Sequence, residues 1–304
     1  MSPTYYEDRL TKGQSLIETS NVKRLLTCTY LLTDPDDPYS TIAVVTAPAG
    51  AGKTIAAGFC QQAVERRFTS ALPSTLVVKV MPRSTSGVLA TNVLENLGEP
   101  VRGDNSSQLT AAAARGVERN DTRFIIFDEG DRLNDDSFEV VRYLQDKTGC
   151  PILVVGLPSI WSVIERQEKF DSRVGLRLSF EPLSLQEMVE VVLPQFVFPR
   201  WSFDPDNDGD HAMGEELWKR VGSSLRKLHN VLTIASKTAV ATSADRITLP
   251  LITESFSLVM SQEDRYRERK RNADPAAEQP GSHEERSQQR HEAKEKKGKK
   301  KDDA

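Results

Sequence analysis

The sequence predicts an α/β fold class: a three-layer domain around a parallel sheet, then a small helical domain and a charged tail. Over residues 41–180, short apolar runs of strand length alternate with segments in which apolar residues recur every three to four positions. From residue 185 the pattern is helical only, and after residue 260 apolar residues nearly disappear. We therefore expect an N-terminal helical segment (1–40), an α/β core (41–182), a helical lid domain (183–260) and a disordered charged tail (261–304).

The composition is that of a globular protein without a large charge excess. Hydrophobic residues make up 38% and charged residues 28% of the 304 residues, and the formal net charge is −4. Such weak acidity excludes a chain coated in positive charge, so any contact with nucleic acid must come from a local basic surface. Cys28, Cys60 and Cys150 lack metal-ligand spacing, and no apolar run approaches the roughly 18 residues of a membrane helix. We expect a cytoplasmic protein without a signal peptide.

Each expected element follows from its residue pattern. Residues 20–32 place Val22, Leu25 and Leu26 at helical spacing before the turn-rich TDPDDPYS. Apolar and β-branched runs typical of buried parallel strands occupy residues 42–45, 75–80, 124–127, 152–155 and 176–180. Helical periodicity covers residues 55–67, 88–97, 109–117, 136–147, 160–168, 185–193, 215–220, 223–241 and 250–260. Pro194 is expected to stop the helix that begins at residue 185.

A phosphate-binding loop follows the first strand. Residues 47–54, APAGAGKT, match the pattern G-x-x-x-x-G-K-[ST] except that Ala47 replaces the first glycine. Two glycines let consecutive N–H groups point at phosphates before a helix N-terminus, Lys53 would hold the β- and γ-phosphates, and Thr54 would bind Mg²⁺. The alternative is a flexible loop before an ordinary helix, but the strand before and the helix after favour nucleotide binding. The expected nucleotide contacts here are Pro48, Ala49, Gly50, Ala51, Gly52, Lys53, Thr54 and Ile55.

Two carboxylates follow the third strand, at the edge of the sheet where the phosphate-binding loop also lies. Asp128 and Glu129 come directly after four apolar residues, and parallel strands deliver such residues to one edge. Asp128 would hold Mg²⁺ directly or through water, and Glu129 would act as general base for attack of water on the γ-phosphate, or position that water. The alternative is a solvated turn with acidic caps. At the end of the next strand, where many nucleotide hydrolases place a polar γ-phosphate sensor, stands Leu157, with Ser159 a weak candidate.

These motifs, an arginine before the last strand and a helical domain that opens with Gly222-x-x-x-Arg226 together resemble AAA+ ATPases. The phrase FIIFDEGDRLNDDSFEVVRYLQDKTGCPILVVGLPSIWSVIERQEKF resembles the Asp-Glu-Ala-Asp-Arg-Leu region of the TnsC, TniB, MuB and IstB regulators of DNA transposition, with Gly130 in place of the usual alanine. The resemblance covers roughly residues 20–240. Related phrases occur in helicase loaders and other AAA+ proteins.

The resemblance implies an ATPase with ATP and Mg²⁺ that oligomerises around double-stranded DNA, as a filament or ring, and recruits or activates a transposase. A target-selection protein is a further implied partner, and the implied location is the bacterial cytoplasm, at the nucleoid when on DNA. Arg173 would be the arginine finger that acts on a neighbouring subunit, with Arg166 in reserve, and Arg226 would be sensor 2. Because Ala47 and Leu157 depart from the family pattern, slow turnover or assembly driven by ATP binding is expected.

DNA contacts in this family are mostly to phosphates, which need only basic and hydroxyl groups. The candidates are Arg83, Ser84 and Thr85 after the second strand and Arg102 in the next polar segment; each could instead cap a surface turn. The tail carries two basic clusters, residues 265–271 and 294–301, suited to DNA or acidic partners or only to solubility. The segment 204–210, DPDNDGD, is interpreted as a solvated turn, because it lacks the glutamate that closes a calcium-binding loop.

Two other functions fit the same motifs. One is a nucleotide-gated scaffold or signalling module without a role on DNA, whose tail recruits a protein. The other is a helicase loader, which would favour single-stranded DNA.

Overall fold

In a computed structural model of the protein, residues 17–36, 39, 41–68 and 73–259 are described. The expected tail, residues 261–304, and the first 16 residues lie outside the described ranges. Contacts divide the chain into two units, Met1–Ser255 and Phe256–Ala304. The predicted boundary between core and lid at residue 182 therefore falls inside the first unit. No helix in the described part of the chain is long and apolar enough to span a membrane.

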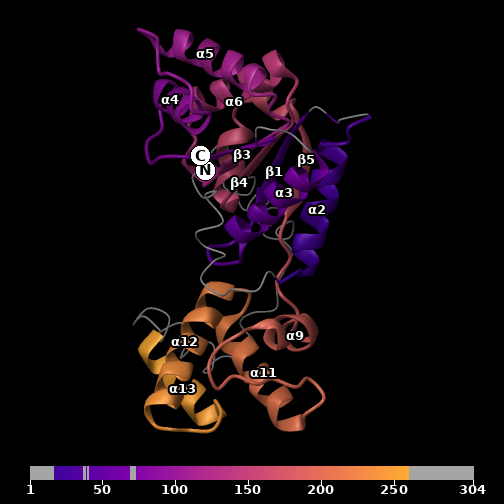
Figure 1. The fold of residues 1–304 in the computed structure, drawn as a ribbon, viewed down its shortest axis with the longest axis vertical. Helices are drawn as coiled ribbons and strands as arrows, with labels where there is room; N and C mark the ends of the chain where they lie inside the picture. Colours follow the sequence, from indigo (N-terminus) through magenta and orange to yellow (C-terminus); the bar gives the residue numbers. More distant parts are fainter. Residues whose placement is uncertain (1–16, 37–38, 40, 69–72, 260–304) are drawn as a thin grey trace, which may run out of the picture. The chain divides into compact units, whose positions relative to one another are not determined.

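A five-stranded parallel sheet forms the centre of the α/β core, as the sequence predicts (Figure 1). Its order is β2-β3-β4-β1-β5, and every neighbouring pair is parallel. The strands are β1 (Ile42–Thr46), β2 (Thr75–Lys79), β3 (Phe124–Asp128), β4 (Ile152–Gly156) and β5 (Val174–Ser179). All residues of β1, β3 and β4 are buried, because helices cover both faces of a parallel sheet.

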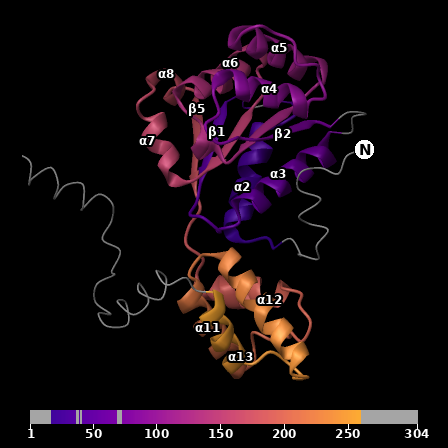
Figure 2. The same ribbon diagram turned by 90° about the vertical axis from the view of Figure 1, so that its left-hand side faces the viewer.

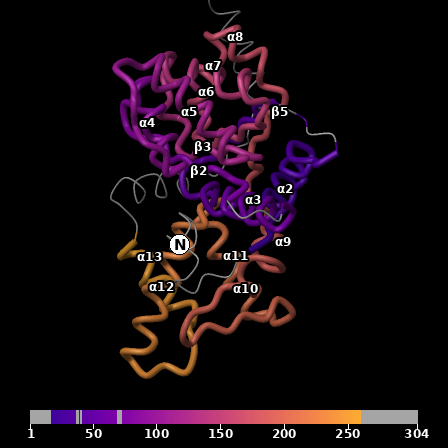
Figure 3. Tube along the Cα trace, turned by 45° about the horizontal axis from the view of Figure 1, so that its top comes forward, coloured from indigo at the N-terminus to yellow at the C-terminus, as the bar shows by residue number. Residues whose placement is uncertain are grey.

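The helices of the core form the two outer layers (Figure 2). On one face α2 (Ser20–Leu32) and α3 (Lys53–Arg67) lie side by side and share one hydrophobic cluster with the sheet (Figure 3). On the other face α4 (Ser86–Asn96), α5 (Ser106–Arg119) and α6 (Asp135–Thr148) share the second cluster. The predicted three-layer architecture is confirmed. α2 has the predicted bounds, and α5 begins three residues before its prediction, where Asn105 caps its N-terminus.

The predicted helix over residues 160–168 is wrong, because the chain is broken there into three short turns. They are the 3₁₀ turn η2 (Pro158–Ile160), α7 (Trp161–Ile164) and α8 (Glu168–Asp171). Between α7 and α8, Gln167 has φ −116° and ψ 80°, outside the helical region. The break lets Phe170 enter the core, where its ring centroid lies 4.4 Å from that of Phe138 on α6. Burial of an aromatic ring outweighs the local helical pattern here.

Pro194 does not stop its helix, contrary to the sequence prediction. The segment is α9 (Leu185–Glu187), the π-helical turn η3 (Met188–Val192) and α10 (Leu193–Gln195). Proline lacks the N–H that continues an α-helix, and a widened turn is one way of absorbing that loss. The side-chain amide of Gln195 donates to the Val191 carbonyl at 2.8 Å, a side-chain contact within the last turn.

The remaining helices are α11 (Asp208–Val221), α12 (Leu225–Ala241) and α13 (Leu249–Val259). α11 begins seven residues before its prediction, because Asn207 caps it and Asp208 and Asp210 occupy its first turn. The interpretation of residues 204–210 as a plain solvated turn is corrected accordingly. Asp210 is only 5% exposed, accepts a hydrogen bond from the Asp204 N–H and pairs with Arg246. Its carboxylate fastens the segment to the helical part of the chain.

Candidate nucleotide-binding site

The loop between β1 and α3 has the backbone that a phosphate cradle requires. Gly50 and Gly52 have φ values of +82° and +88°, a region that other residues rarely adopt. Gly52 is also the N-cap of α3, so the free N–H groups of its first turn face the loop. Pro48 and Ala49 are exposed at the tip. The predicted cradle is thus present in the structure as a loop that ends at a helix N-terminus.

Ala47 departs from the usual glycine without distorting this loop. Its backbone lies outside the left-handed region, so the position does not depend on the freedom of glycine. The methyl group is 2% exposed and packs in the cluster that joins the sheet to α3, and its N–H donates to the Gly156 carbonyl at 3.3 Å. The substitution exchanges a flexible residue for one that fits the core.

Lys53 lies along the cradle. Its Nζ donates to the carbonyls of Ala47 and Pro48 at 2.6 and 2.9 Å. Burial lowers the pKa of Lys53, the nearby Arg226 adds to this effect, and Asp131 and Asp128 oppose it. The two loop carbonyls therefore hold the Lys53 ammonium over the loop, where phosphates would bind.

Asp128 ends β3 beside the cradle and is 2% exposed. Its Oδ1 accepts the Glu129 N–H at 2.9 Å, whereas Oδ2 is buried with no hydrogen-bond partner among the described residues. Burial raises the pKa of Asp128, and the nearby Thr54 hydroxyl opposes the shift. An unpaired buried oxygen costs free energy unless a ligand satisfies it. A carboxylate and a hydroxyl that meet in this way are hard oxygen ligands and fit the expected Mg²⁺.

Glu129 is held by two cations that sequence reasoning missed. Its carboxylate forms ion pairs with Lys79 at 3.1 Å and with Arg132, whose Nη1 also donates to the Val80 carbonyl. Lys79 lies directly opposite Asp128 in the register of the neighbouring strands β2 and β3. A lysine at the end of an otherwise apolar strand was the available signal. To act as general base, Glu129 must exchange or share these partners.

Leu157 stands at the end of β4 and offers no polar side chain. Its N–H donates to Asp131 Oδ1 at 2.9 Å, and Ser159 is exposed. Nearby, the Trp161 indole donates to the Thr46 hydroxyl at 3.3 Å. Gly130 replaces the usual alanine because a Cβ there would lie 2.4 Å from Cγ1 of Val154. At the end of β4, the polar contacts of the described residues therefore come from backbone groups and from Asp131, Thr46 and Trp161.

Arg226 reaches the same edge from α12. Its backbone N–H donates to the Gly50 carbonyl at 3.2 Å. A Cβ on Gly50 would lie 2.6 Å from the hydroxyl of Ser224, the N-cap of α12. The first turn of α12 therefore contacts the cradle, as the sequence predicts for a sensor-2 arginine, while its role in binding stays a prediction.

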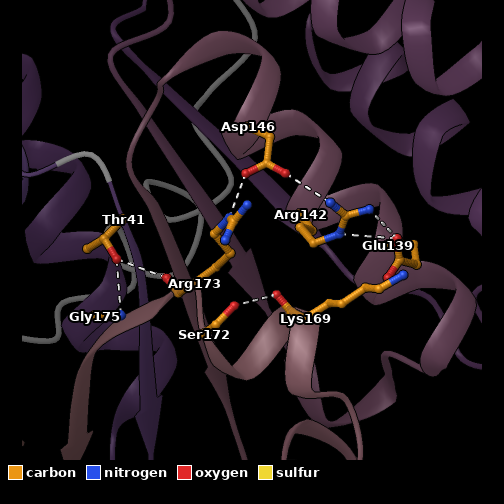
Figure 4. A network of polar contacts seen from close by, with 8 residues as sticks. All are labelled: Thr41, Glu139, Arg142, Asp146, Lys169, Ser172, Arg173 and Gly175. Carbon is orange, nitrogen blue, oxygen red and sulfur yellow. Dashed lines mark hydrogen bonds and ion pairs between the residues drawn. The ribbon is translucent and has the colours of Figure 1, made fainter.

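Arg173 lies at the other edge of the sheet, where the strands begin, whereas the cradle lies where they end. It directly precedes β5, whose first residue pairs with Ile42 at the start of β1, whereas the cradle follows the end of β1. Its guanidinium is exposed and pairs with Asp146 at 2.8 Å (Figure 4). Arg166 is exposed in the break between α7 and α8. Neither assignment as an arginine finger is decided by these positions.

The candidate DNA contacts differ in exposure. Arg83, with φ +56°, and Arg102 are exposed. Ser84 is 0% exposed and its backbone bridges Leu133, so its hydroxyl cannot touch DNA without movement of the loop. The Thr85 hydroxyl caps α4 by accepting the Val88 N–H. Arg83, Thr85 and Arg102 are thus the exposed members of the set, and the Thr85 hydroxyl is already engaged in the helix cap.

Comparison with known proteins agrees with this geometry. Residues 37–164 match the family model described as an AAA domain. Among curated proteins, none matches the sequence. Three similar solved structures are the Aeropyrum pernix Orc1 protein in complex with DNA, the Aeropyrum pernix Orc2 protein in its ADP form and the Thermotoga maritima RuvB Holliday junction branch migration motor.

The similarity lies in the fold, since the identities are 19%, 15% and 15%. The TM-scores are 0.59, 0.62 and 0.50, and the matches cover 79%, 81% and 82% of this chain. The chain spans 64% of the Orc1 protein, 69% of Orc2 and 74% of RuvB. With its parallel sheet and phosphate cradle, the protein has an AAA+ P-loop fold, within which residues 37–164 match the AAA domain model.

Proposed function

We propose that the protein is an ATPase whose assembly on double-stranded DNA regulates transposition. The observation that carries the ATPase activity is the buried Asp128, whose unpartnered Oδ2 lies at the edge of the sheet that also holds Thr54 and Lys53. Burying an ionisable group in this way is unfavourable for folding alone, and such groups concentrate at functional sites.

Each residue of the site has a chemical part in hydrolysis. The N–H groups from Gly50 to Thr54 and the Lys53 ammonium would bind the phosphates of ATP. Thr54 and Asp128 would hold Mg²⁺, which supplies charge neutralisation at the phosphate oxygens when bound. Glu129 would accept a proton from the attacking water after exchange of its Lys79 or Arg132 contact.

Binding to DNA is supported by three features. Arg83 and Arg102 are exposed on a protein of net charge −4, which fits a local contact with phosphates. One structure of the same fold, Orc1, is described as a complex with DNA. The resemblance of the segment 124–170 to TnsC, TniB, MuB and IstB adds the more specific function, with a transposase and a target-selection protein as partners.

The test is electron microscopy of the full-length protein with duplex DNA and a slowly hydrolysed ATP analogue, together with ATP hydrolysis on adding DNA and the cognate transposase. We expect filaments or rings that require nucleotide, and hydrolysis that rises with DNA. Lys53→Ala serves as the matched control without phosphate binding. Absence of any oligomer on DNA, or oligomers that Lys53→Ala forms equally well, would contradict the proposal.

A helicase loader or replication initiator is the second candidate, favoured by the fold shared with Orc1 and Orc2. Preference for single-stranded over double-stranded DNA and no effect on transposition would favour a loader. Assembly and hydrolysis that ignore DNA altogether would instead favour a scaffold or signalling module.

A further inference from the structure

Arg173 is fixed through both its backbone and its side chain (Figure 4). Its carbonyl accepts hydrogen bonds from the Thr41 hydroxyl at 2.9 Å and from the Ile42 N–H at 3.1 Å. Its own N–H donates to the Phe170 carbonyl at 2.9 Å. The side chain is 45% exposed, and its Nε donates to Asp146 Oδ1 at 2.8 Å. An exposed arginine is thus ordered in one direction at the sheet edge.

This arginine cannot reach the cradle of its own chain. β1 and β5 are parallel, and Arg173 lies beside the first residue of β1, whereas the cradle begins after its last. At about 3.3 Å per residue, the five residues of β1 separate the two edges by roughly 15 Å. That distance exceeds the reach of an arginine side chain. Any phosphate that Arg173 binds therefore belongs to another molecule.

Asp146 is itself held by a row of alternating charges on α6. Its second oxygen accepts Arg142 Nη1 at 2.9 Å, and Arg142 donates from Nε and Nη2 to Glu139 Oε2 at 3.1 and 2.6 Å. Glu139, Arg142 and Asp146 occupy successive turns of one helix face. Because Asp146 is bound from the other side, it cannot follow Arg173 freely, and it orients the guanidinium plane.

The contact with Asp146 uses Nε and leaves the end of the guanidinium free. Among the described residues, neither Nη nitrogen of Arg173 takes part in a hydrogen bond. Two parallel N–H donors on a planar group match a pair of phosphate oxygens. Exposed ion pairs contribute little to stability, so the row of charges is better explained by orientation of Arg173 than by folding.

We propose that Asp146 is a positioning residue: it orients Arg173 so that both Nη groups bind the γ-phosphate of ATP in the site of a neighbouring copy. This inference rests on the proposed ATPase function and on ATP lying between copies. Arg173 is the group that touches the phosphate, and Asp146 acts through it. A duplex DNA phosphate is the other anion that Arg173 could meet, and the test separates the two.

The test mixes full-length variants on duplex DNA with ATP and Mg²⁺. Glu129→Gln subunits donate an intact Arg173 but cannot hydrolyse ATP, and Arg173→Ala subunits hydrolyse only if a neighbour supplies the arginine. We expect the mixture to exceed the summed activity of the separate variants. Adding Asp146→Asn to the donor should reduce this gain about 10-fold, because small displacements of a catalytic group are costly.

The same substitution in the wrong subunit provides the control. Asp146→Asn added to the Arg173→Ala acceptor should leave the gain unchanged, since no arginine there needs orientation. Asp171→Asn in the donor is the matched surface variant, because Asp171 pairs with Arg177 and not with Arg173. Asp146→Glu in the donor should restore part of the gain.

Each contrary result is decisive. Equal gain with and without Asp146→Asn in the donor overturns the positioning role and leaves the proposed function intact. A loss that also appears in the acceptor shows a general structural effect and overturns it too. No gain in the first mixture excludes the site between copies and overturns this inference, whereas the proposed ATPase function stands or falls with the hydrolysis and assembly of the wild-type protein on DNA. If Arg173→Ala instead lowers the slope of DNA affinity against salt, Arg173 binds DNA and not ATP.

Discussion

The two edges of the sheet hold their charged side chains in opposite ways. At the edge that follows β1 and β3, Asp128 is buried and Lys53 is half-buried, and burial shifts the pKa of each away from its ordinary value. At the other edge Arg173 and Asp146 are exposed and bind each other at 2.8 Å. A buried edge with unsatisfied groups suits capture of a ligand, and an exposed, oriented cation suits delivery to a second molecule. In the proposed assembly one chain would carry two unlike half-sites, the arrangement that head-to-tail assembly requires.

The largest effect on ATP binding is expected at the buried edge. Lys53→Ala should weaken ATP binding about 100-fold, because it removes charge-assisted hydrogen bonds to phosphates. Titration with a fluorescent ATP analogue measures the dissociation constant. Arg66→Ala, an exposed residue in the last turn of the same helix, is the control and should change affinity less than twofold. If Lys53→Ala binds ATP with an affinity within threefold of wild type, Lys53 does not bind the phosphates, and the buried edge is not the site of ligand capture.

Glu129→Gln should lower hydrolysis by roughly 10²- to 10⁴-fold, the usual contribution of a general base, while ATP binding and assembly persist. Phosphate release and electron microscopy of the same samples measure the two properties. Glu168→Gln, an exposed glutamate of α8, is the control and should leave both unchanged. Normal turnover of Glu129→Gln would show that the assignment as general base is wrong.

Alanine substitution of one glycine at each edge compares how well the two edges tolerate an added methyl group. A Cβ on Gly130 would lie 2.4 Å from Cγ1 of the fully buried Val154, and a Cβ on Gly175 would lie 2.4 Å from the Thr41 hydroxyl. Gly130→Ala should destabilise the protein by about 1–3 kcal/mol through overpacking. Gly175→Ala should cost less, because Gly175 is exposed at an edge strand and can shift.

Urea unfolding measures both free energies, and adding Val154→Ala to Gly130→Ala should relieve part of its cost. A larger loss for Gly175→Ala than for Gly130→Ala would reverse the comparison of the two edges.

The smallest effect is expected for Lys79→Met, which removes one cation from Glu129. We expect hydrolysis without DNA to rise roughly threefold, because a partly exposed ion pair contributes up to about 1 kcal/mol. Steady-state phosphate release is the measurement, and Lys169→Met on α8 is the control. A decrease would mean that Lys79 holds Glu129 in its reactive position.

Much of the buried edge could be predicted from the sequence, because its residues are close together in the chain. Gly50, Gly52, Lys53 and Thr54 lie close together in one loop. Asp128 comes after a short, wholly apolar run whose length and composition are typical of a buried strand. Even there, the reason for Ala47 depends on a backbone angle that no residue pattern reveals. The contacts of Glu129 also escaped prediction, since Lys79 lies on another strand.

The exposed edge was harder to predict for a physical reason. Asp146 and Arg173 come from separate elements, and their pairing depends on how α6, α8 and β5 pack. Helical periodicity over residues 160–168 and the stop at Pro194 both failed, because burial of Phe170 and a widened turn override local preference. Residue patterns report local structure, and these features are set by distant neighbours.

The hydrogen bond from the Arg226 N–H to the Gly50 carbonyl has a consequence for regulation. Linkage is reciprocal, so if nucleotide binding changes the affinity of a partner for α12 through this bond, that partner changes the nucleotide affinity by the same factor. A partner protein that grips α12 would therefore alter nucleotide affinity from a distance. Through this bond, a protein that binds the helical part of the chain would regulate the nucleotide site.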